Sequence, residues 1–322
     1  MQTSKTLIIN QFLLLAALVL SHNAMASNCL YVSSYHKGYE WNDGIERGLE
    51  KTLGNTCKLD KFYMDTKRQQ DTVHGKKQGI AAREHILNTQ PDVIIACDDN
   101  ASRYLVKPYF RNSKLPFVFC GINWTVEQYG YPYTNVTGMI EVAPIEQTLK
   151  TIRDIVISVR SGVYLSSDVF TEHKDFSHYK QFFTDNRVQV PGVFVKTFEE
   201  WKQAFLLAQT ADFVLLGNNA GINDWDENAA REFVLKNSKT LTVTNYDWMM
   251  PYSMFAMTKI PEEQGEWAGQ VALSVLSGEN INNIPVVINR RWNMYVNPDL
   301  LKTTNISIPS SIMQKAIRVG QE

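Results

Sequence analysis

The side chains best suited to chemistry in this chain stand directly after its short apolar runs. Ser, Asn, Asp, Tyr and Trp predominate there, and they supply hydrogen bonds and flat apolar surfaces for a small polar ligand. The carboxylates of Asp98, Asp99, Asp168 and Asp247 can pair with an ammonium group, to which nearby aromatic rings add cation–π attraction. The segments are 33–41, 98–101, 121–124, 166–168, 217–221 and 246–248.

Each of these residues also has a purely structural explanation. Asp and Asn at strand ends commonly cap helices. Trp41, Trp124 and Trp248 fit an apolar core, and Gly217 and Gly221 fit turn geometry. The hypothesis of a ligand site therefore depends on convergence, because six strand ends carry the same composition.

Signatures of catalysis are weak. The chain has no GxSxG elbow, no HExxH pair and no phosphate-binding GxxxxGK[ST] loop. Its histidines lack metal-ligand spacing with cysteines, so we expect no metal and no cofactor. His36 can act as a general base or can simply hydrogen-bond within its loop; together with Asp99 it defines an enzyme hypothesis that ranks last.

The elements that position these segments alternate between strand and helix. Apolar runs predict strands at 29–33, 59–64, 92–96 and 115–120, and helical periodicity predicts helices at 42–53, 69–88 and 101–108. Such a series is typical of a parallel sheet covered on both faces. Ligands bind these sheets beyond the carboxyl ends of the strands, which is where the polar segments stand.

The alternation then restarts in the second half of the chain. Strands are predicted at 136–140, 161–165, 188–195, 212–216 and 240–244, and helices at 144–157, 173–184, 199–209 and 226–235. A helix at 262–276, strand-like runs at 285–289 and 292–296 and a short helix from about 309 complete the chain. Two consecutive series predict two α/β lobes of similar pattern, with the chain crossing between them more than once.

Residues 1–26 predict a secretory signal peptide. Lys5 supplies positive charge, residues 12–20 form a short apolar run, and Ala24-Met25-Ala26 provides small residues before a cut after Ala26. The apolar run is shorter than the roughly 20 residues that span a bilayer, and an uncleaved anchor is the alternative. We therefore expect an exported protein.

All four cysteines lie in the first third of the chain that follows this signal. Cys29 and Cys57 open apolar runs, whereas Cys97 and Cys120 close them. Because like ends of parallel strands are neighbours, the pairs Cys29–Cys57 and Cys97–Cys120 are geometrically reasonable disulfides. Four buried free thiols are the alternative.

The charge balance excludes one class of partner. The formal net charge is −1 and no basic stripe is present, so we expect no nucleic-acid binding.

Several stretches of this chain resemble the periplasmic solute-binding proteins of the ABC-transporter substrate-binding family. The branch that they most resemble includes proteins linked to bacterial sensor kinases and diguanylate cyclases. The matching stretches are 33–48 (SSYHKGYEWNDGIERG), 91–100 (PDVIIACDDN), 116–123 (PFVFCGIN), 216–221 (LGNNAG) and the segment around 265–278.

The resemblance implies a type I periplasmic binding fold. In that fold two Rossmann-like α/β lobes with parallel sheets are joined by a hinge and close on a ligand, without catalysis. We expect a signal at 1–26, a first lobe at 27–140 plus about 250–285, and a second lobe at 141–249 plus about 286–322. Carried over by position, the ligand shell is Ser34, Tyr35, Trp41, Asp99, Asn100, Asn123, Asp168, Asn218, Asn219 and Asp247.

Two functions share this cleft. In the first, a monomeric periplasmic receptor captures a small polar solute, amino-acid-like or with an amine or ring, and delivers it to the membrane permease of an ABC transporter. In the second, the closed form docks on a membrane sensor, a histidine kinase or diguanylate cyclase. The residues do not discriminate between the two, and transport is the favoured description.

Overall fold

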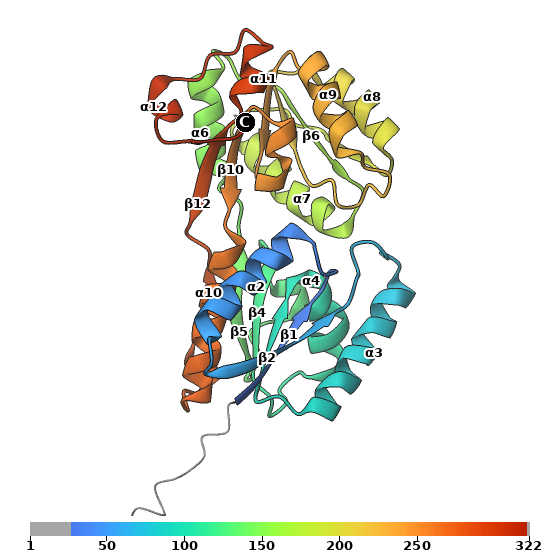
Figure 1. The fold of residues 1–322 in the computed structure, drawn as a ribbon, viewed down its shortest axis with the longest axis vertical. Helices are drawn as coiled ribbons and strands as arrows, with labels where there is room; N and C mark the ends of the chain where they lie inside the picture. Colours follow the sequence, from blue (N-terminus) through green and yellow to red (C-terminus); the bar gives the residue numbers. More distant parts are fainter. Residues whose placement is uncertain (1–26, 321–322) are drawn as a thin grey trace, which may run out of the picture.

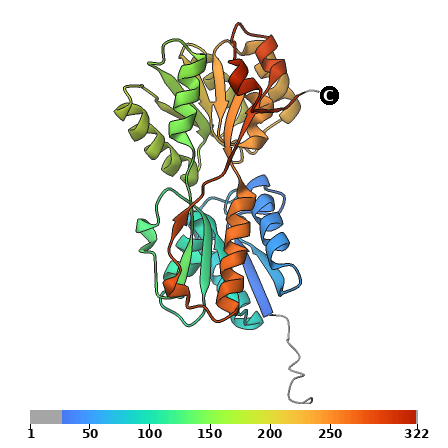
Figure 2. The same cartoon turned by 90° about the vertical axis from the view of Figure 1, so that its left-hand side faces the viewer.

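The computed structural model describes residues 27–320, and the predicted signal peptide lies outside them. Two α/β lobes are stacked along the long axis of the molecule (Figure 1). Each is built around its own sheet, and the chain crosses between them at 142–144, at Ile260 and at 289–291 (Figure 2). Among the described residues, no helix is long and apolar enough to cross a membrane.

The first lobe contains a six-stranded parallel sheet in the order β11-β5-β4-β3-β1-β2. Its elements are β1 (Ser27–Ser33), α2 (Glu40–Leu53), β2 (Cys57–Tyr63), α3 (Thr72–Thr89), β3 (Val93–Cys97), α4 (Asp98–Ala101), η1 (Ser102–Val106), α5 (Lys107–Tyr109), β4 (Phe117–Asn123), η2 (Glu127–Tyr129), β5 (Val136–Glu141), α10 (Pro261–Leu276), η4 (Ile281–Asn283) and β11 (Val287–Ile288).

The second lobe contains a seven-stranded sheet in the order β13-β12-β10-β9-β8-β6-β7, parallel except for the pairing of β10 with β12. Its elements are α6 (Ile145–Ile155), β6 (Gly162–Ser167), α7 (Phe170–Asp185), β7 (Gly192–Val195), α8 (Phe198–Ala208), β8 (Phe213–Leu216), α9 (Glu227–Asn237), β9 (Leu241–Thr244), η3 (Asp247–Tyr252), β10 (Phe255–Lys259), β12 (Trp292–Val296), α11 (Pro298–Lys302), α12 (Ser310–Met313) and β13 (Ile317–Arg318).

The two sheets repeat one topology. The order 2-1-3-4-5 of the first five strands recurs in β7-β6-β8-β9-β10, so the strand order reverses between β1 and β3 and again between β6 and β8. The prediction of two parallel-dominated α/β lobes is therefore confirmed. Because ligands bind beyond the carboxyl ends of strands at such switch points, the topology directs attention to the gap between the lobes.

The lobe boundaries differ from the predicted ones in the last third of the chain. Residues 255–259, which we expected in the first lobe, form β10 and pair with β9 in the second sheet. Residues 287–288, expected in the second lobe, form β11 beside β5 in the first sheet. The reason is that β10 continues the parallel series of the second lobe before the chain returns at Pro261.

Helix α10 is the element that returns to the first lobe, and it packs closely on α2. A Cβ on Gly265 would overlap the backbone of Ile45, and a Cβ on Gly48 would overlap the carbonyl of Glu262. Both glycines are therefore required by the close approach of the two helix backbones. This contact fixes the position of α10, the helix with which the chain returns from the second lobe.

Two disulfides stiffen the first lobe. Cys29 of β1 is bonded to Cys57 of β2, with Cα atoms 5.8 Å apart, and Cys97 of β3 to Cys120 of β4, with Cα atoms 4.5 Å apart. The second bond joins the carboxyl end of β3 to β4, directly before Asp98.

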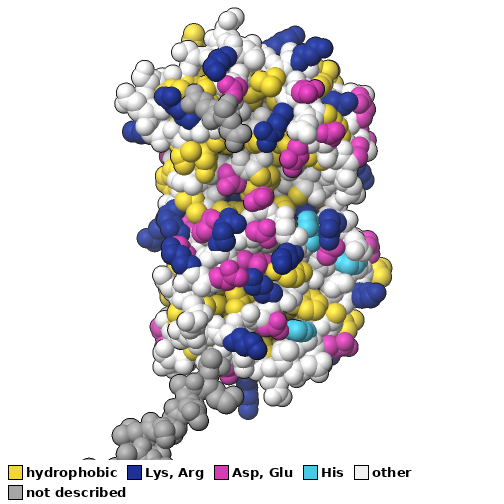
Figure 3. Space-filling view, viewed as in Figure 1, with side chains coloured by type: hydrophobic (Ala, Val, Ile, Leu, Met, Phe, Trp, Pro, Cys, Tyr) yellow, Lys and Arg dark blue, Asp and Glu magenta, His cyan; other side chains and the backbone are white. Residues whose placement is uncertain are grey.

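Charged side chains of both signs are interspersed over the face shown in Figure 3. No extended basic stripe stands out among the described residues on that face.

Candidate functional site

A deep cavity lies where the carboxyl ends of the two sheets meet. Its volume is about 20 Å³, room for about one water molecule. Both lobes contribute to it, and its lining is Tyr35, Tyr39, Trp41, Lys67, Asp98, Asn123, Glu141, Thr171, Glu172, Asn218 and Tyr246.

Direct bonds across the gap hold the lobes against each other. The Asn218 amide donates to the Tyr39 hydroxyl at 2.6 Å, and the Lys67 ammonium donates to the Thr171 hydroxyl at 3.1 Å. Also across the gap, the Lys174 ammonium lies 2.6 Å from an Asp99 carboxylate oxygen. The structure is therefore that of a closed cleft.

Aromatic rings form the walls of this cleft. The Lys67 ammonium lies 4.8 Å from the centre of the Tyr35 ring and 5.4 Å from that of Tyr39. The Lys259 ammonium lies 4.8 Å from the Tyr246 ring centre and 5.5 Å from that of Trp41. Each cation thus stands against two rings, an arrangement that attracts ammonium groups strongly when water is excluded.

Acidic groups outnumber basic ones in the buried centre. The carboxyl groups of Asp98, Asp99, Glu141, Glu172 and Asp175 are buried there. They face the ammonium groups of three lysines, Lys67, Lys174 and Lys259. Buried charges are costly unless they are paired, so the excess must be carried as bound protons or offset by a bound cation.

Two of these carboxyl groups have a pKa that is raised to about 6 or 7. Burial raises the pKa of Glu141 to about 7, although the ammonium of Lys259 opposes the rise. Burial likewise raises the pKa of Asp175 to about 6. The Trp124 indole N–H donates to one oxygen of Asp175, and the other oxygen has no hydrogen-bond partner among the described residues.

Asp98 is the least satisfied acid of the cleft. Its Oδ2 is buried and has no hydrogen-bond partner within residues 27–320. Burial raises the pKa of its carboxyl well above the usual value, and the nearby charges of Glu141 and Asp99 add to the rise. Its backbone adopts a φ of 70°, which L residues rarely adopt, and strain of this kind clusters at functional sites.

Glu172, in contrast, is held firmly by its own lobe. Its Oε2 accepts from the Ser166 hydroxyl at 2.7 Å and the Tyr164 hydroxyl at 2.9 Å. The Asn218 backbone N–H also donates to Oε2, at 3.2 Å. Oε1 lies 4.0 Å from the Lys67 ammonium, so it is a pre-positioned carboxylate that faces the first lobe.

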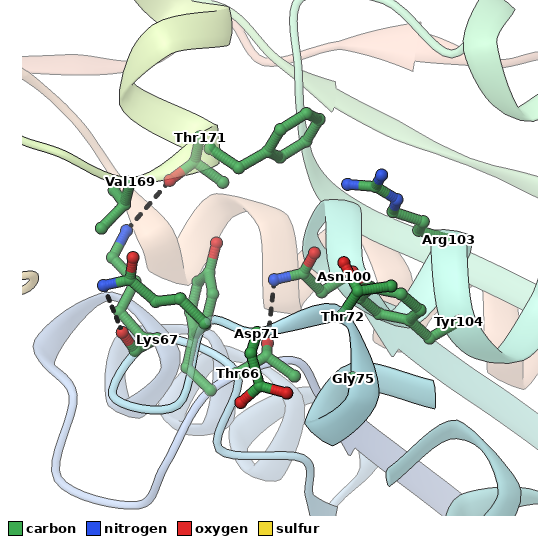
Figure 4. A pocket seen from close by; sticks show the side chains of 13 residues that line it. Thr66, Lys67, Asp71, Thr72, Gly75, Asn100, Arg103, Tyr104, Val169 and Thr171 are labelled. Carbon is green, nitrogen blue, oxygen red and sulfur yellow. Dashed lines mark hydrogen bonds between the residues drawn. The ribbon is translucent and has the colours of Figure 1, made fainter. Parts of the chain in front are cut away.

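A second, outer cavity of about 120 Å³ adjoins the deep one (Figure 4). The loop after β2, the start of α3 and the start of α7 line it, together with Asn100, Arg103 and Tyr104. The Arg103 guanidinium lies 5.0 Å from the centre of the Phe170 ring, across the gap. The two cavities share Tyr35, Lys67 and Thr171.

The predicted ligand residues divide into groups. Tyr35, Trp41, Asn123 and Asn218 line the deep cavity, and Asn100 lines the outer one.

Two of the predicted residues lie beneath the cavities. Asp99 is fully buried in its pair with Lys174 and also accepts from the Tyr129 hydroxyl at 2.6 Å. The Ser34 hydroxyl donates to the Cys97 carbonyl at 2.7 Å and accepts from the Ala101 N–H at 2.8 Å. Their positions indicate that they shape the first-lobe face of the cleft.

The structure places the remaining three away from both cavities. Asp168 bonds His173 at 2.6 Å and lies 3.3 Å from the Lys196 ammonium, at the edge of the second lobe. Asp247 is exposed at the start of η3, and Asn219 lines neither cavity. His36, the general-base candidate, is likewise absent from the cavity walls and lies 3.6 Å from Asp65.

Sequence reasoning missed most of the charged residues of the cleft. Lys67 belongs to the loop after β2, and the rule that directs attention to strand ends applies to this loop as well. Glu172 and Asp175 belong to the first turns of α7, where helical periodicity alone does not show which face meets the other lobe. Glu141 and Lys259 close strands that lead into crossings between the lobes.

Residues 27–320 contain no cluster of three His, Cys, Asp or Glu side chains placed to hold a metal ion.

No protein-family model matches this chain, and no curated protein matches it by sequence. Solved structures do match. One is a conserved domain protein from Vibrio cholerae, with a TM-score of 0.70 and 14% identity, covering 91% of this chain and 99% of that chain. Another is the ABC domain in complex with L-Trp from Streptococcus pneumonia, with a TM-score of 0.69 and 16% identity, covering 91% and 99%.

A third match is the ligand-free, open structure of a substrate-binding protein with adhesive properties from Clostridium difficile. Its TM-score is 0.66 at 14% identity, covering 92% of this chain and 100% of that chain. A LacI transcriptional regulator from Lactobacillus brevis matches more distantly, with a TM-score of 0.54 at 12% identity, covering 83% and 99%. The chain therefore has the type I periplasmic binding fold.

Proposed function

We propose that this protein is a solute-binding receptor whose cleft closes on a small organic compound carrying an ammonium group. The closed form then delivers the compound to the membrane permease of an ABC transporter. The observation that carries the proposal is the buried excess of carboxyl groups between aromatic walls, with Asp98 Oδ2 left without a hydrogen-bond partner among the described residues.

The chemistry of the cleft selects for a cation. An ammonium group gives an unpaired carboxylate both a charge partner and a hydrogen-bond donor, and Tyr39, Trp41 and Tyr246 supply the faces of aromatic rings. A neutral solute can donate a hydrogen bond but brings no charge. An anionic solute would add to the excess of negative charge, which a dry cleft opposes strongly.

Closure follows from the two-sided lining. A solute that touches Asp98 in the first lobe and Glu172 in the second has contacts in the closed form that the open form lacks. Differential affinity of this kind shifts the population toward the closed form. The deep cavity has room for only about one water molecule, so the lobes must separate before a solute can reach it.

The destination is proposed from the fold and the sequence. Periplasmic and extracellular binding proteins share this fold, and the two disulfides suit an oxidising compartment. We therefore place the protein in the periplasm as a monomer, exported by the signal at residues 1–26 and cut after Ala26. A sensor kinase or diguanylate cyclase is the alternative membrane partner, and it would bind the same closed form.

The test uses pairs of solutes that differ only in the ammonium group. Tryptamine and tryptophol form one pair, and tyramine and tyrosol form another; L-tryptophan is included because a neighbour of similar fold holds it. Calorimetry on ligand-stripped protein should show binding by an ammonium-bearing member and at least tenfold weaker binding by its hydroxyl analogue, a difference of about 1.4 kcal/mol.

Two variants locate the interaction. Asp98→Asn should weaken binding of the amine, because a neutral amide replaces the carboxylate that pairs with it. Asp154→Asn is the matched control, because Asp154 lies exposed on α6 away from the cleft. Equal binding of amines and alcohols, or an Asp98→Asn variant with undiminished affinity for the amine, would count against the proposal.

A further inference from the structure

Lys67 belongs to the loop between β2 and α3, yet it is buried, which is unusual for a lysine in a loop. It follows β2 in the first lobe, its side chain is buried, and Figure 4 shows it reaching toward Thr171 of the second lobe. Its ammonium lies against the rings of Tyr35 and Tyr39 and 4.0 Å from the Glu172 carboxylate. A charged group of this protein therefore already stands in the cleft, against one of the rings (Tyr39) and near one of the carboxylates (Glu172) that we assign to the solute.

Lys67 is held less firmly than the other lysines of the cleft. Lys259 is hydrogen-bonded to the Glu141 carboxylate, and Lys174 lies 2.6 Å from Asp99. Within residues 27–320, the Lys67 side chain makes one hydrogen bond, to the uncharged Thr171 hydroxyl. An ammonium group has three donors, so this one remains under-satisfied in a buried place. Burial also lowers the pKa of Lys67, which reflects the same cost.

The side chain of Lys67 also stands between the two cavities. The deep cavity of about 20 Å³ and the outer cavity of about 120 Å³ both have Lys67 in their walls. Moving this side chain aside joins them into one space that runs from Glu172 to Arg103. Room for a solute larger than a water molecule therefore depends on where Lys67 lies.

We propose that Lys67 is a built-in competitor for the ammonium site, whose side chain closes the empty cleft and must be displaced by the solute. This inference rests on the proposed function for the identity of the site that Lys67 fills. It gives Lys67 a share in holding the empty cleft closed, together with the other bonds between the lobes, and it sets an affinity that a solute must exceed in order to displace the side chain.

The threshold has a measurable size. When the binding-competent state is populated only in part, the apparent dissociation constant equals the intrinsic one divided by that fraction. If the Lys67 side chain is away from the ammonium site one tenth of the time, removing this side chain lowers the apparent dissociation constant of an amine by about tenfold.

The experiment is a chemical rescue: the Lys67 side chain is truncated, and a small ammonium compound added to the solution replaces the part that was removed. Lys67→Ala deletes the part of the side chain that n-propylammonium reproduces, so n-propylammonium chloride is the probe. 1-Propanol controls for the alkyl group, and sodium chloride at equal ionic strength controls for salt. Lys202→Ala is the matched variant, because Lys202 also lies over a ring, Phe198, and pairs with a carboxylate, Glu199, but on the face of α8.

Rescue is read by thermal unfolding and by small-angle X-ray scattering. Lys67→Ala should melt lower and have a larger radius of gyration than the wild type. n-Propylammonium should raise its Tm by about 2 °C or more and restore the smaller radius. The wild type and Lys202→Ala should not respond. Equal rescue by 1-propanol, an equal response of the wild type, or no rescue would overturn the proposal.

A second variant keeps the test decisive if Lys67→Ala does not fold. Lys67→Met preserves an apolar stem without the cation, so it should show a larger radius of gyration than the wild type and no response to n-propylammonium. An unchanged radius would contradict the proposal. Failure of rescue in a protein whose wild type binds amines overturns the role of Lys67 alone. Rescue of Lys67→Ala by n-propylammonium, with no binding of the larger solute amines by the wild type or by Lys67→Ala, overturns the proposed function alone.

Discussion

Replacing Lys174 by methionine should open the cleft. Its side chain is nine-tenths buried, and its ammonium lies 2.6 Å from Asp99, whose side chain is fully buried in the other lobe. Methionine keeps most of the apolar stem and removes the ammonium, which also donates to the Thr125 carbonyl at 3.1 Å. The variant therefore leaves the Asp99 carboxylate buried without its partner whenever the lobes are closed.

The size of the effect follows from the remaining contacts of Asp99. Breaking a buried ion pair by removing one partner costs about 3–5 kcal/mol. Asp99 keeps hydrogen bonds from the Tyr129 hydroxyl at 2.6 Å and from the Asn123 amide at 3.2 Å, so the lower end applies. A cost of about 3 kcal/mol in the closed form raises the ratio of open to closed molecules about a hundredfold.

Small-angle X-ray scattering measures this opening, and hydrogen exchange of peptides that line the cleft reports it independently. Lys51→Met is the control, because its pair with Glu266 joins two helices of the same lobe at 2.8 Å and Lys51 is largely exposed. We expect it to cost less than about 0.5 kcal/mol and to leave the radius of gyration unchanged.

Adding Asp99→Asn to Lys174→Met provides a further check. The double variant should be more closed than Lys174→Met alone, because no unpaired charge remains buried. If Lys174→Met has the radius of gyration and exchange pattern of the wild type, the reasoning that this pair holds the lobes together is refuted.

Three further predictions concern stability. The pKa of the Asp175 carboxyl is raised from 3.8 to about 6 in the folded protein, so its protonated form stabilises the fold fully below pH 3.8, and this stabilisation is lost as the pH rises through 6. The free energy of unfolding of Asp175→Asn, measured in urea, should therefore rise by about 3 kcal/mol relative to that of the wild type between pH 4 and pH 8. A difference between the two proteins that does not change with pH contradicts this prediction. Replacing both Cys97 and Cys120 by serine, which removes a bond closing 23 residues of chain, should lower the free energy of unfolding by about 3 kcal/mol, and an unchanged value would show that the bond is not formed. Gly265→Ala places a Cβ against the backbone of α2 and should cost about 1–3 kcal/mol in the same assay, so a neutral result would show that α2 and α10 are packed less closely.

The alternation of strands and helices was predictable because each apolar run is short and bounded by polar segments. The carboxyl ends of those runs in turn located part of the cleft, since Tyr35, Asn123 and Asn218 all follow strands and line the deep cavity. The return of the chain to the first lobe was placed too early because no strand was predicted at residues 255–259, and the pairing of β10 with β9 assigns them to the second sheet.

The charged residues of the cleft were not predictable from strand ends alone. Glu172 becomes part of the cleft because Tyr164 and Ser166 hold its carboxylate and because α7 faces the first lobe. Lys67 reaches the other lobe only because the loop after β2 lies at the lobe boundary. Asp168 follows a strand as expected but lies beside His173 at the edge, so position after a strand does not decide which way a side chain points.

The most direct measurement is calorimetric titration of ligand-stripped protein with tryptamine and tryptophol, or with the corresponding pair for whichever amine first raises the Tm. The cleft described here predicts that the amine binds, that its hydroxyl analogue binds at least tenfold more weakly, and that Asp98→Asn removes most of this difference. Binding of neutral or anionic solutes alone, with no amine bound, would contradict the claim that the buried carboxylates select an ammonium group.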